Sequence, residues 1–356
     1  MNPGKNIKAK MSTNMNTYLK MISTFLCAVL LLCPLVGCST HSGGSEPVLI
    51  RIGHTDSATR STHLWSVWLG VYLNEHAPGR FIVEVYPDGE LGDTSELIEG
   101  LKNNTVNMVF DLSAVVAAAA GPEAACIDLP YLYPTYEDWL TGTFENGGLE
   151  LFQNSIKDYG YYCIDMYYNG MRQLISRTGP YRSPEDVEGQ KIRIARNLLN
   201  IDLWQTMGAY PAPMSWGQVI DALEKGQIDA LDHSLGVFND FNLHKIAPYI
   251  TLTNHASSPF PIITSLEWIN SLDADLRKIL EEGVHEMARQ QREDERAMES
   301  KYIERFKSEG AIVEEMTADE INNFIQAVQP VYNTWRKIAG DRAVDAWLAT
   351  IPTKAQ

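Results

Sequence analysis

Between residues 48 and 120 the chain alternates short apolar runs with segments of helical periodicity. Alternating apolar and polar residues are typical of strands, whereas apolar residues spaced three and four apart are typical of helices. Strands are therefore predicted at 48–54, 81–87 and 106–112, and helices at 61–77, 93–104 and 113–120. Because strands and helices alternate, we expect an α/β fold with a largely parallel sheet.

The middle of the chain continues in the same style. Asn169-Gly170 is a typical turn pair, so it predicts a turn between two strands at 161–168 and 171–176. Ser183 followed by a proline predicts a helix start, and Ser215 with Gln218 predicts a capping box. Further segments are a strand at 191–195, a helix at 198–207 and a strand at 228–233.

One helical pattern near the end of the chain is unusually long. It covers residues 273–309, and about 37 residues at 1.5 Å each would reach roughly 55 Å. That length exceeds one small domain, so the helix is expected to lie across two of them. Gly283 is a candidate for a kink within it.

The N-terminal residues predict a signal peptide. A basic, acid-free start is followed by an apolar run from about Phe25 to Val36, which is too short to span a bilayer as a helix. The run ends at Leu-Val-Gly-Cys38, which resembles the lipobox of bacterial lipoproteins and predicts lipidation of Cys38 after removal of residues 1–37. An ordinary secretory signal with an incidental cysteine is the alternative.

The mature protein would be strongly acidic. Residues 1–37 hold four of the 29 basic residues and none of the 45 acidic ones, so 25 basic residues would remain and the formal charge would be −20. Such a chain lacks the basic surface that binds nucleic acid. Anionic lipids would repel it, so attachment to a membrane is expected through the lipid anchor only. Cys126 and Cys163 could pair in an oxidising compartment, but their spacing leaves this open.

Standard catalytic signatures are missing from the sequence. It contains no nucleophile elbow, zinc-protease motif, phosphate-binding loop or Cys-x-x-Cys pair. Asp229, Asp232 and His233 are the best metal candidates, yet Asp232 and His233 would face opposite sides of a strand. We therefore expect no metal site, no cofactor and no enzyme, with a hydrolase using Asp229 or Asp232 as base kept as an alternative.

The strand at 191–195 carries two cations. Lys191 and Arg193 alternate with Ile192 and Ile194, so the basic side chains share one face. Exposed basic residues on strands are common, and a solvated edge is one interpretation. The other is that Arg193 binds an anion, because a guanidinium offers a rigid fork of donors that meets a carboxylate through two hydrogen bonds.

A wider constellation favours the second interpretation. It includes Arg172, Gly-x-Lys-x-Arg ending at Arg193, Gly208-Ala209, and Pro-Met before Trp216. Together with "YPDGELGDTSELIEGLKNNTVNMVF" and "DLPYLYP", it resembles the solute-binding proteins of tripartite ATP-independent periplasmic (TRAP) transporters. The resemblance extends over about residues 48–350.

The resemblance implies a two-lobed periplasmic-binding-protein-like α/β fold of type II, each lobe a sheet flanked by helices. After a tether at 38–47, the lobes would comprise 48–169 with 259–298, and 170–258 with 299–356. The long helix would span both. The implied ligand-binding residues are Arg193, which would pair with a carboxylate, and Arg172, His233, Trp216, Asn169, Arg196, Ser113 and His54.

The implied function is capture of a small organic acid outside the cytoplasm and its delivery to the membrane permease subunits of a TRAP transporter, by a monomeric receptor. A sensory module that presents the solute to a membrane receptor is an alternative. His233 stands where the sialic-acid-binding branch has asparagine, which argues against sialic acid. The sequence does not name the acid.

Overall fold

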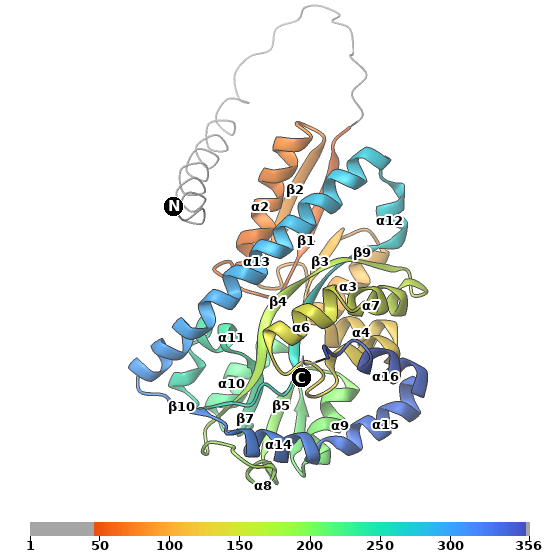
Figure 1. Cartoon of the computed structure of the whole chain (residues 1–356). Helices are drawn as coiled ribbons and strands as arrows, with labels where there is room; N and C mark the ends of the chain where they lie inside the picture. The colour runs from red at the N-terminus through yellow and green to blue at the C-terminus, as the bar shows by residue number, and fades with distance from the viewer. Residues whose placement is uncertain (1–45, 354–356) are drawn as a thin grey trace, which may run out of the picture. The chain divides into compact units, whose positions relative to one another are not determined.

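The computed structural model describes residues 46–353. The predicted signal peptide and Cys38 lie outside the described residues. The strands form two sheets that share the long strand β4 (Tyr161–Ser176), and helices cover both sheets (Figure 1).

The first sheet begins with the predicted parallel strands. β1 (Val48–Gly53) pairs in parallel with β2 (Phe81–Tyr86) and with β3 (Met108–Phe110). The helices between and after them also form as predicted: α2 (Ser61–His76), α3 (Thr94–Lys102) and α4 (Ser113–Ala120). At the start of α3, Asp93 and Glu96 form a capping box, as the Asp-x-x-Glu spacing favours.

Two long strands connect the sheets. β4 and β9 (Ser257–Ser265) run antiparallel to each other, and β9 also pairs antiparallel with β3, so the first sheet is mixed rather than largely parallel. The turn predicted at Asn169-Gly170 is wrong, because both residues lie inside β4. The register between β4 and β9 shifts between Tyr168 and Met171, and Gly170 has a φ of 99°. A glycine with positive φ occurs in one type of β-bulge as well as in tight turns, which is why the sequence could not separate them.

The second sheet uses the C-terminal half of β4. That half pairs antiparallel with β7 (Ala230–Ser234) and with β8 (Tyr249–Leu252). β5 (Lys191–Ile194) lies between β7 and β6 (Tyr210–Pro213), parallel to both, and β10 (Ile312–Glu315) pairs with β8. The intervening helices are α8 (Pro184–Val187), α9 (Leu198–Thr206), α10 (Val219–Glu224) and α11 (Leu235–Asp240).

The predicted long helix is confirmed as α13 (Ala274–Ser308), which crosses the described region diagonally in Figure 1. It packs on α2 beside the first sheet and on α11 and β10 beside the second. At Gly283 an added Cβ would lie 2.6 Å from the Tyr72 ring and 3.0 Å from Leu69. This glycine therefore permits close packing on α2, and the helix continues through it.

The C-terminal helices return toward the first sheet. They are α14 (Ala318–Ala327), α15 (Gln329–Ala339) and α16 (Asp341–Leu348). α15 packs on α9, whereas α16 packs on α7 (Gly148–Lys157), which lies beside the first sheet. The sequence assigns residues 299–356 to the second lobe, yet Thr350 shares a 2.5 Å hydrogen bond with the Tyr133 hydroxyl of the first. The remaining helices of the first lobe are α5 (Pro122–Ala125), α6 (Tyr136–Phe144) and α12 (Leu266–Ser271).

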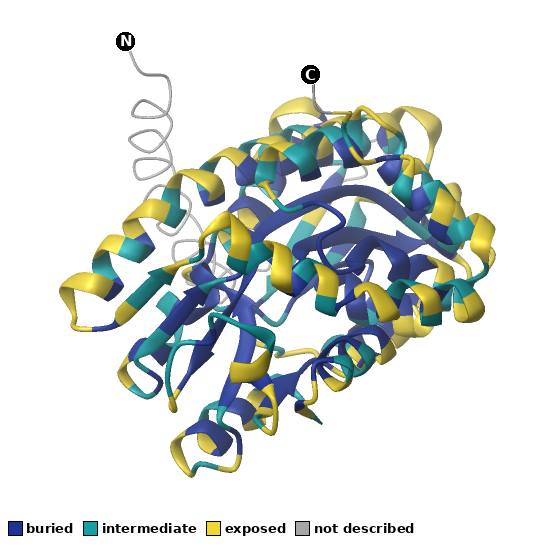
Figure 2. Ribbon diagram, turned by 60° about the horizontal axis from the view of Figure 1, so that its bottom comes forward, coloured by how far each residue is buried: buried dark blue, intermediate teal, exposed yellow. Residues whose placement is uncertain are grey.

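Buried residues concentrate on the strands and on the inner faces of the helices, whose outer faces are exposed (Figure 2). Cys126 and Cys163 both lie in the core as free thiols, so the structure has no disulfide between them. Burial raises the pKa of Cys126 to about 12 and that of Cys163 well above its usual value. Both thiols are therefore unreactive at neutral pH.

Candidate functional site

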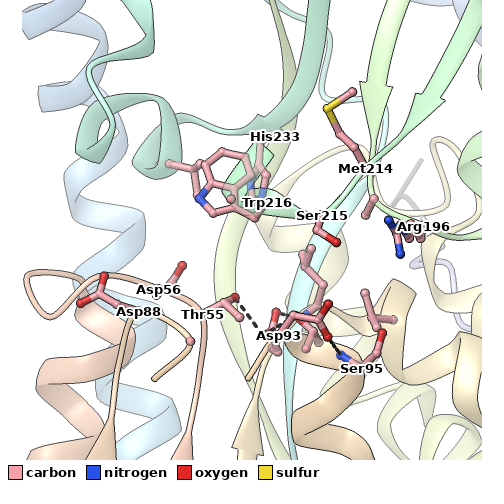
Figure 3. Close-up of a pocket in the computed structure, with 18 of the residues that line it drawn as sticks. Thr55, Asp56, Asp88, Asp93, Ser95, Arg196, Met214, Ser215, Trp216 and His233 are labelled. Atoms are coloured by element: carbon pink, nitrogen blue, oxygen red, sulfur yellow. Dashed lines mark hydrogen bonds between the residues drawn. The ribbon is translucent and has the colours of Figure 1, made fainter. Parts of the chain in front are cut away.

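A cavity lies between elements of the two lobes. It holds roughly 1100 Å³ of empty space, part of it open to solvent. Figure 3 shows one wall carrying Met214, Ser215, Trp216 and His233, and an opposite wall carrying Thr55, Asp56, Asp88, Asp93 and Ser95. The polar and charged residues in the lining are Thr55, Asp56, Asp88, Asp93, Thr94, Ser95, Asp111, Arg193, Arg196, Ser215 and His233.

Arg193 lies in the second-lobe wall. It is on β5, which is an inner strand of its sheet and not an edge. Ile192 and Ile194 are fully buried in the core on one face, and Arg193 projects from the other face, as the alternation predicts. The Arg193 side chain is nevertheless only 3% exposed. A solvated edge is therefore excluded for Arg193, whereas Lys191 is exposed.

Within residues 46–353 the Arg193 guanidinium has no ionic partner. Its Nη2 donates to the carbonyl oxygen of Met214 at 2.9 Å, whereas Nε and Nη1 are buried and have no hydrogen-bond partner among the described residues. The other buried arginines within residues 46–353 all contact carboxylates: Arg60 contacts Asp56, Arg172 contacts Asp232, and Arg292 contacts Asp165. Burial lowers the pKa of Arg193 to about 10, so the side chain is a desolvated cation at neutral pH.

Trp216 and His233 form an aromatic wall beside this cation. Arg193 lies 5.3 Å from the Trp216 ring centroid, and Trp216 lies edge-on to His233 and to Phe241 at 5.4 and 5.0 Å. Burial, helped by Arg172 and Arg193, holds the pKa of His233 well below its usual value, so the ring is neutral. Its Nδ1 accepts from the Ser234 amide at 2.9 Å, which leaves the proton on Nε2 as a donor.

The capping box predicted at Ser215 is wrong. Ser215 precedes a 3₁₀ turn at Trp216–Gln218, makes no cap hydrogen bond with its side chain, and lines the cavity. Helix α10 starts only at Val219. The tight turn keeps Trp216 at the cavity.

Arg172 lies beside the cavity lining in a buried ion pair. Its Nε donates to Asp232 Oδ2 at 2.8 Å and its Nη2 to the Asp232 carbonyl at 2.7 Å. His255 contacts the same carboxylate at 3.1 Å. Burial acts to raise the pKa of Asp232, but the charge and hydrogen bonds of Arg172 and His255 hold it below its usual range. The positive charge of Arg172 is thus already matched within the protein.

The other predicted ligand residues fall into two groups. Arg196 is exposed and lines the cavity. Asn169, Ser113 and His54 are buried but outside the lining: Asn169 accepts from Arg60, Ser113 donates to Asp128 at 2.7 Å, and His54 contacts His63 at 3.2 Å. The cavity therefore brings together Arg193, Arg196, Trp216 and His233.

Four aspartates of the first-lobe wall were not singled out from the sequence. Asp111 directly follows β3, Asp88 lies two residues beyond the end of β2, Asp56 lies three residues beyond the end of β1, and Asp93 caps α3. Parallel strands that share a sheet bring their carboxyl ends to one edge, which is where ligands bind in such folds. Asp88 directly follows the strand predicted at 81–87 and Asp56 lies just beyond the one predicted at 48–54, whereas Asp111 falls inside the strand predicted at 106–112, so the sequence carried this signal for two of the three strands.

Neither a membrane span nor a metal cluster is found in the described part of the chain. No helix within residues 46–353 is both long and apolar enough to cross a bilayer. The same residues contain no group of three or more histidine, cysteine, aspartate or glutamate side chains placed to hold a metal ion.

The family model of the bacterial extracellular solute-binding proteins, family 7 (DctP), matches residues 52–338. The chain belongs to this family. The match covers both lobes and every residue of the cavity lining. Its members bind solutes and are not enzymes, which confirms the sequence-based expectation of a binding protein.

Curated relatives and solved structures agree with this assignment. The C4-dicarboxylate-binding protein DctB of Bacillus subtilis is 23% identical over 305 residues, covering 84% of this chain and 85% of the relative. The 2,3-diketo-L-gulonate-binding periplasmic protein YiaO of Escherichia coli is 25% identical over 264 residues, covering 74% of this chain and 80% of the relative.

Solved structures confirm the two-lobed fold. A TRAP periplasmic solute-binding protein from Shewanella oneidensis with bound succinate superposes with a TM-score of 0.81 at 20% identity, covering 86% of this chain and all of the other. The sugar acid binding protein DctPAm from Advenella mimigardefordensis, in complex with galactonate, superposes with a TM-score of 0.81 at 22% identity, covering 86% of this chain and 98% of the other.

Proposed function

We propose that this DctP-family protein captures a small organic acid in the cavity between its lobes and delivers it to the permease subunits of a TRAP transporter. The ligand carboxylate pairs with Arg193 through two hydrogen bonds. Trp216 and His233 flank the carboxylate, and Arg196 contributes positive charge at the mouth of the cavity. The family's extracytoplasmic role and the carboxylate ligands named for several relatives support this assignment.

The observation that carries the proposal is the unmatched charge of Arg193. A buried cation without a counter-ion is costly, and proteins normally pair such a charge. Nε and Nη1 of Arg193 have no partner within the described residues, and Arg193 is one of the residues that line the cavity. A carboxylate that enters the cavity would satisfy both donors and neutralise the charge.

Calorimetric titration tests this proposal. Protein is freed of co-purified ligand by unfolding and refolding, then titrated with a panel of mono- and dicarboxylates of two to six carbons. Arg193→Ala should weaken binding by about a hundredfold or more, because it leaves the ligand's charge unpaired. Arg193→Lys should remain well below the wild type, because it keeps the charge and loses the fork.

Lys191→Ala is the matched control. Lys191 is on the same strand but is exposed and outside the cavity lining, so its removal should leave the affinity unchanged. Near-normal affinity in Arg193→Ala would contradict the pairing, and a protein that binds no carboxylate would contradict the proposed function.

We further propose that the mature protein is attached to the membrane through lipid on Cys38, as the Leu-Val-Gly-Cys sequence predicts. Cys38→Ser should move the protein from the membrane fraction to the soluble fraction and change its processed mass. If the variant fractionates with membranes at the same mass as the wild type, Cys38 is not lipidated.

A further inference from the structure

The two walls of the cavity differ in charge. The second-lobe wall contains Arg193 on β5 and the nearby Arg196. The first-lobe wall contains Asp56, Asp88 and Asp93, which Figure 3 shows opposite Trp216 and His233. Asp111 lies in the same first-lobe wall. A ligand that bridges the walls therefore meets cations at one end and carboxylates at the other. The opposite charges of the two walls therefore restrict the chemical class of the ligand more narrowly than Arg193 alone does.

Two first-lobe carboxylates keep acceptor capacity for a ligand. Asp88 is exposed and no group within residues 46–353 hydrogen-bonds its side chain. Asp93 uses Oδ1 to accept from the amides of Ser95 and Glu96 at 3.0 and 3.1 Å, which leaves Oδ2 without a protein donor among the described residues. Asp56 and Asp111, in contrast, are buried and already accept from protein groups.

This wall disfavours a second carboxylate on the ligand. Two like charges within about 5 Å at a partly solvated site, where the effective dielectric constant is about 20, repel strongly enough to weaken binding by on the order of a hundredfold. A dicarboxylate that pairs with Arg193 would bring its other charge toward Asp88 and Asp93. A ligand with donors at its far end would gain hydrogen bonds to the same oxygens.

Hydroxyl side chains in the wall indicate which donors fit. Thr55 and Thr94 donate their protons to Asp111 at 2.9 and 2.8 Å, so their hydroxyl oxygens can act toward a ligand only as acceptors. Ser95 and Ser215 in the lining can both donate and accept. A ligand hydroxyl, which also donates and accepts, matches this mixture, whereas an ammonium group only donates.

We propose that the ligand is a polyhydroxylated monocarboxylate whose carboxylate pairs with Arg193 and whose hydroxyls donate to Asp88 and Asp93. The inference rests on the proposed function for the carboxylate end and adds the chemistry of the opposite end. The unpartnered, buried Nε and Nη1 of Arg193 fix the orientation, because they admit the carboxylate at the second-lobe wall alone.

A length-matched panel tests the ligand class. Aldonates of four to six carbons are compared by calorimetry with the dicarboxylate, the ω-amino acid and the unsubstituted carboxylate of equal length. At least one aldonate should bind tenfold or more tightly than each of its three counterparts. Tighter or equal binding of a dicarboxylate or an ω-amino acid overturns this inference, and so does a panel in which no aldonate binds.

The double variant Asp88→Asn/Asp93→Asn tests the contacts. Asparagine tolerates the positive φ of 53° at Asp88 and caps helices as well as aspartate does, so the fold should be kept, as a melting curve will check. Aldonate affinity should fall by about tenfold or more, because charged acceptors become neutral, and dicarboxylate affinity should rise. Asp158→Asn/Asp319→Asn removes the same charge at exposed sites outside the cavity and should change neither affinity.

The two proposals fail separately. Unchanged aldonate affinity in Asp88→Asn/Asp93→Asn, with normal dependence on Arg193, would refute the hydroxyl contacts and leave the carboxylate receptor intact. Near-normal affinity in Arg193→Ala would instead refute the pairing with Arg193, and a protein that binds no carboxylate would refute the proposed function itself.

Discussion

Replacing each of two buried arginines by methionine should have opposite effects on the ligand-free protein. Arg172 and Arg193 are 5% and 3% exposed, and methionine keeps much of their length without the charge. Arg172 is paired with Asp232, whereas no carboxylate in the described part of the chain forms a salt bridge with Arg193. We predict that Arg172→Met destabilises the fold and that Arg193→Met leaves it unchanged or slightly more stable.

The change in the free energy of unfolding expected for Arg193→Met follows from the pKa of Arg193. Burial lowers this pKa from 12.5 to about 10, which is worth roughly 3 kcal/mol against the charged form at 1.36 kcal/mol per unit. Because the folded pKa lies below the unfolded one, the charge destabilises the fold at every pH below about 10. Methionine removes that penalty but loses the hydrogen bond to Met214, worth about 1.5–3 kcal/mol. The free energy of unfolding should therefore rise by about 0–1.5 kcal/mol.

Arg172→Met should instead lower the free energy of unfolding. The Arg172 guanidinium makes two hydrogen bonds to Asp232, which is 0% exposed. Removing one member of a buried ion pair typically costs about 3–5 kcal/mol, because the other charge stays buried without its partner. His255 would still contact Asp232 and would recover part of that loss.

Urea unfolding at pH 7, on protein refolded without ligand, measures both changes. The same samples are then titrated with any acid that binds the wild type. If Arg193→Met loses as much stability as Arg172→Met, Arg193 stabilises the fold itself, and its charge is not kept for a ligand. The comparison requires that the free energy of unfolding falls with urea concentration at a similar slope in all three proteins, since a changed slope would indicate a different unfolding transition.

Three further predictions follow from the packing and charge of the fold. Burial raises the pKa of Asp128 to about 7, although the hydrogen bond from Ser113 and the charge of Arg172 act to lower it, so folding stability should fall by up to roughly 4 kcal/mol as the pH rises from about 4 to about 8. Asp128→Asn should flatten this part of the profile of stability against pH, and an equal pH dependence in both proteins would contradict the prediction. Gly283→Ala should destabilise by about 1–3 kcal/mol in thermal unfolding, since its Cβ would lie 2.6 Å from Tyr72; an unchanged or raised melting temperature would show that Tyr72 moves aside. If the lobes close around the ligand through β4 and β9, the radius of gyration from small-angle scattering should decrease at saturation, and a constant value would count against closure.

Periodicity alone determined most of the secondary structure. The strands before and after α2, the capping box at Asp93, and the length of α13 are all local properties of the chain, so they could be read from residue spacing. The alternation around Arg193 likewise determined that its side chain lies on the face opposite Ile192 and Ile194. The constellation around Arg193 identified the family correctly.

Tertiary structure decided what depends on contacts between distant segments. The positive φ of Gly170 suits a turn or a bulge equally, and only pairing with β9 makes it a bulge. Arg172 and Arg193 look alike in the sequence, yet Arg172 forms a salt bridge with Asp232, whereas Arg193 is buried without a salt bridge to any residue within 46–353. The acidic wall arises because three strands end at one edge of a sheet. Burial and charge pairing are set by neighbours far apart in the chain, so residue spacing predicted where Arg193 points and the fold decided that its charge is unpaired.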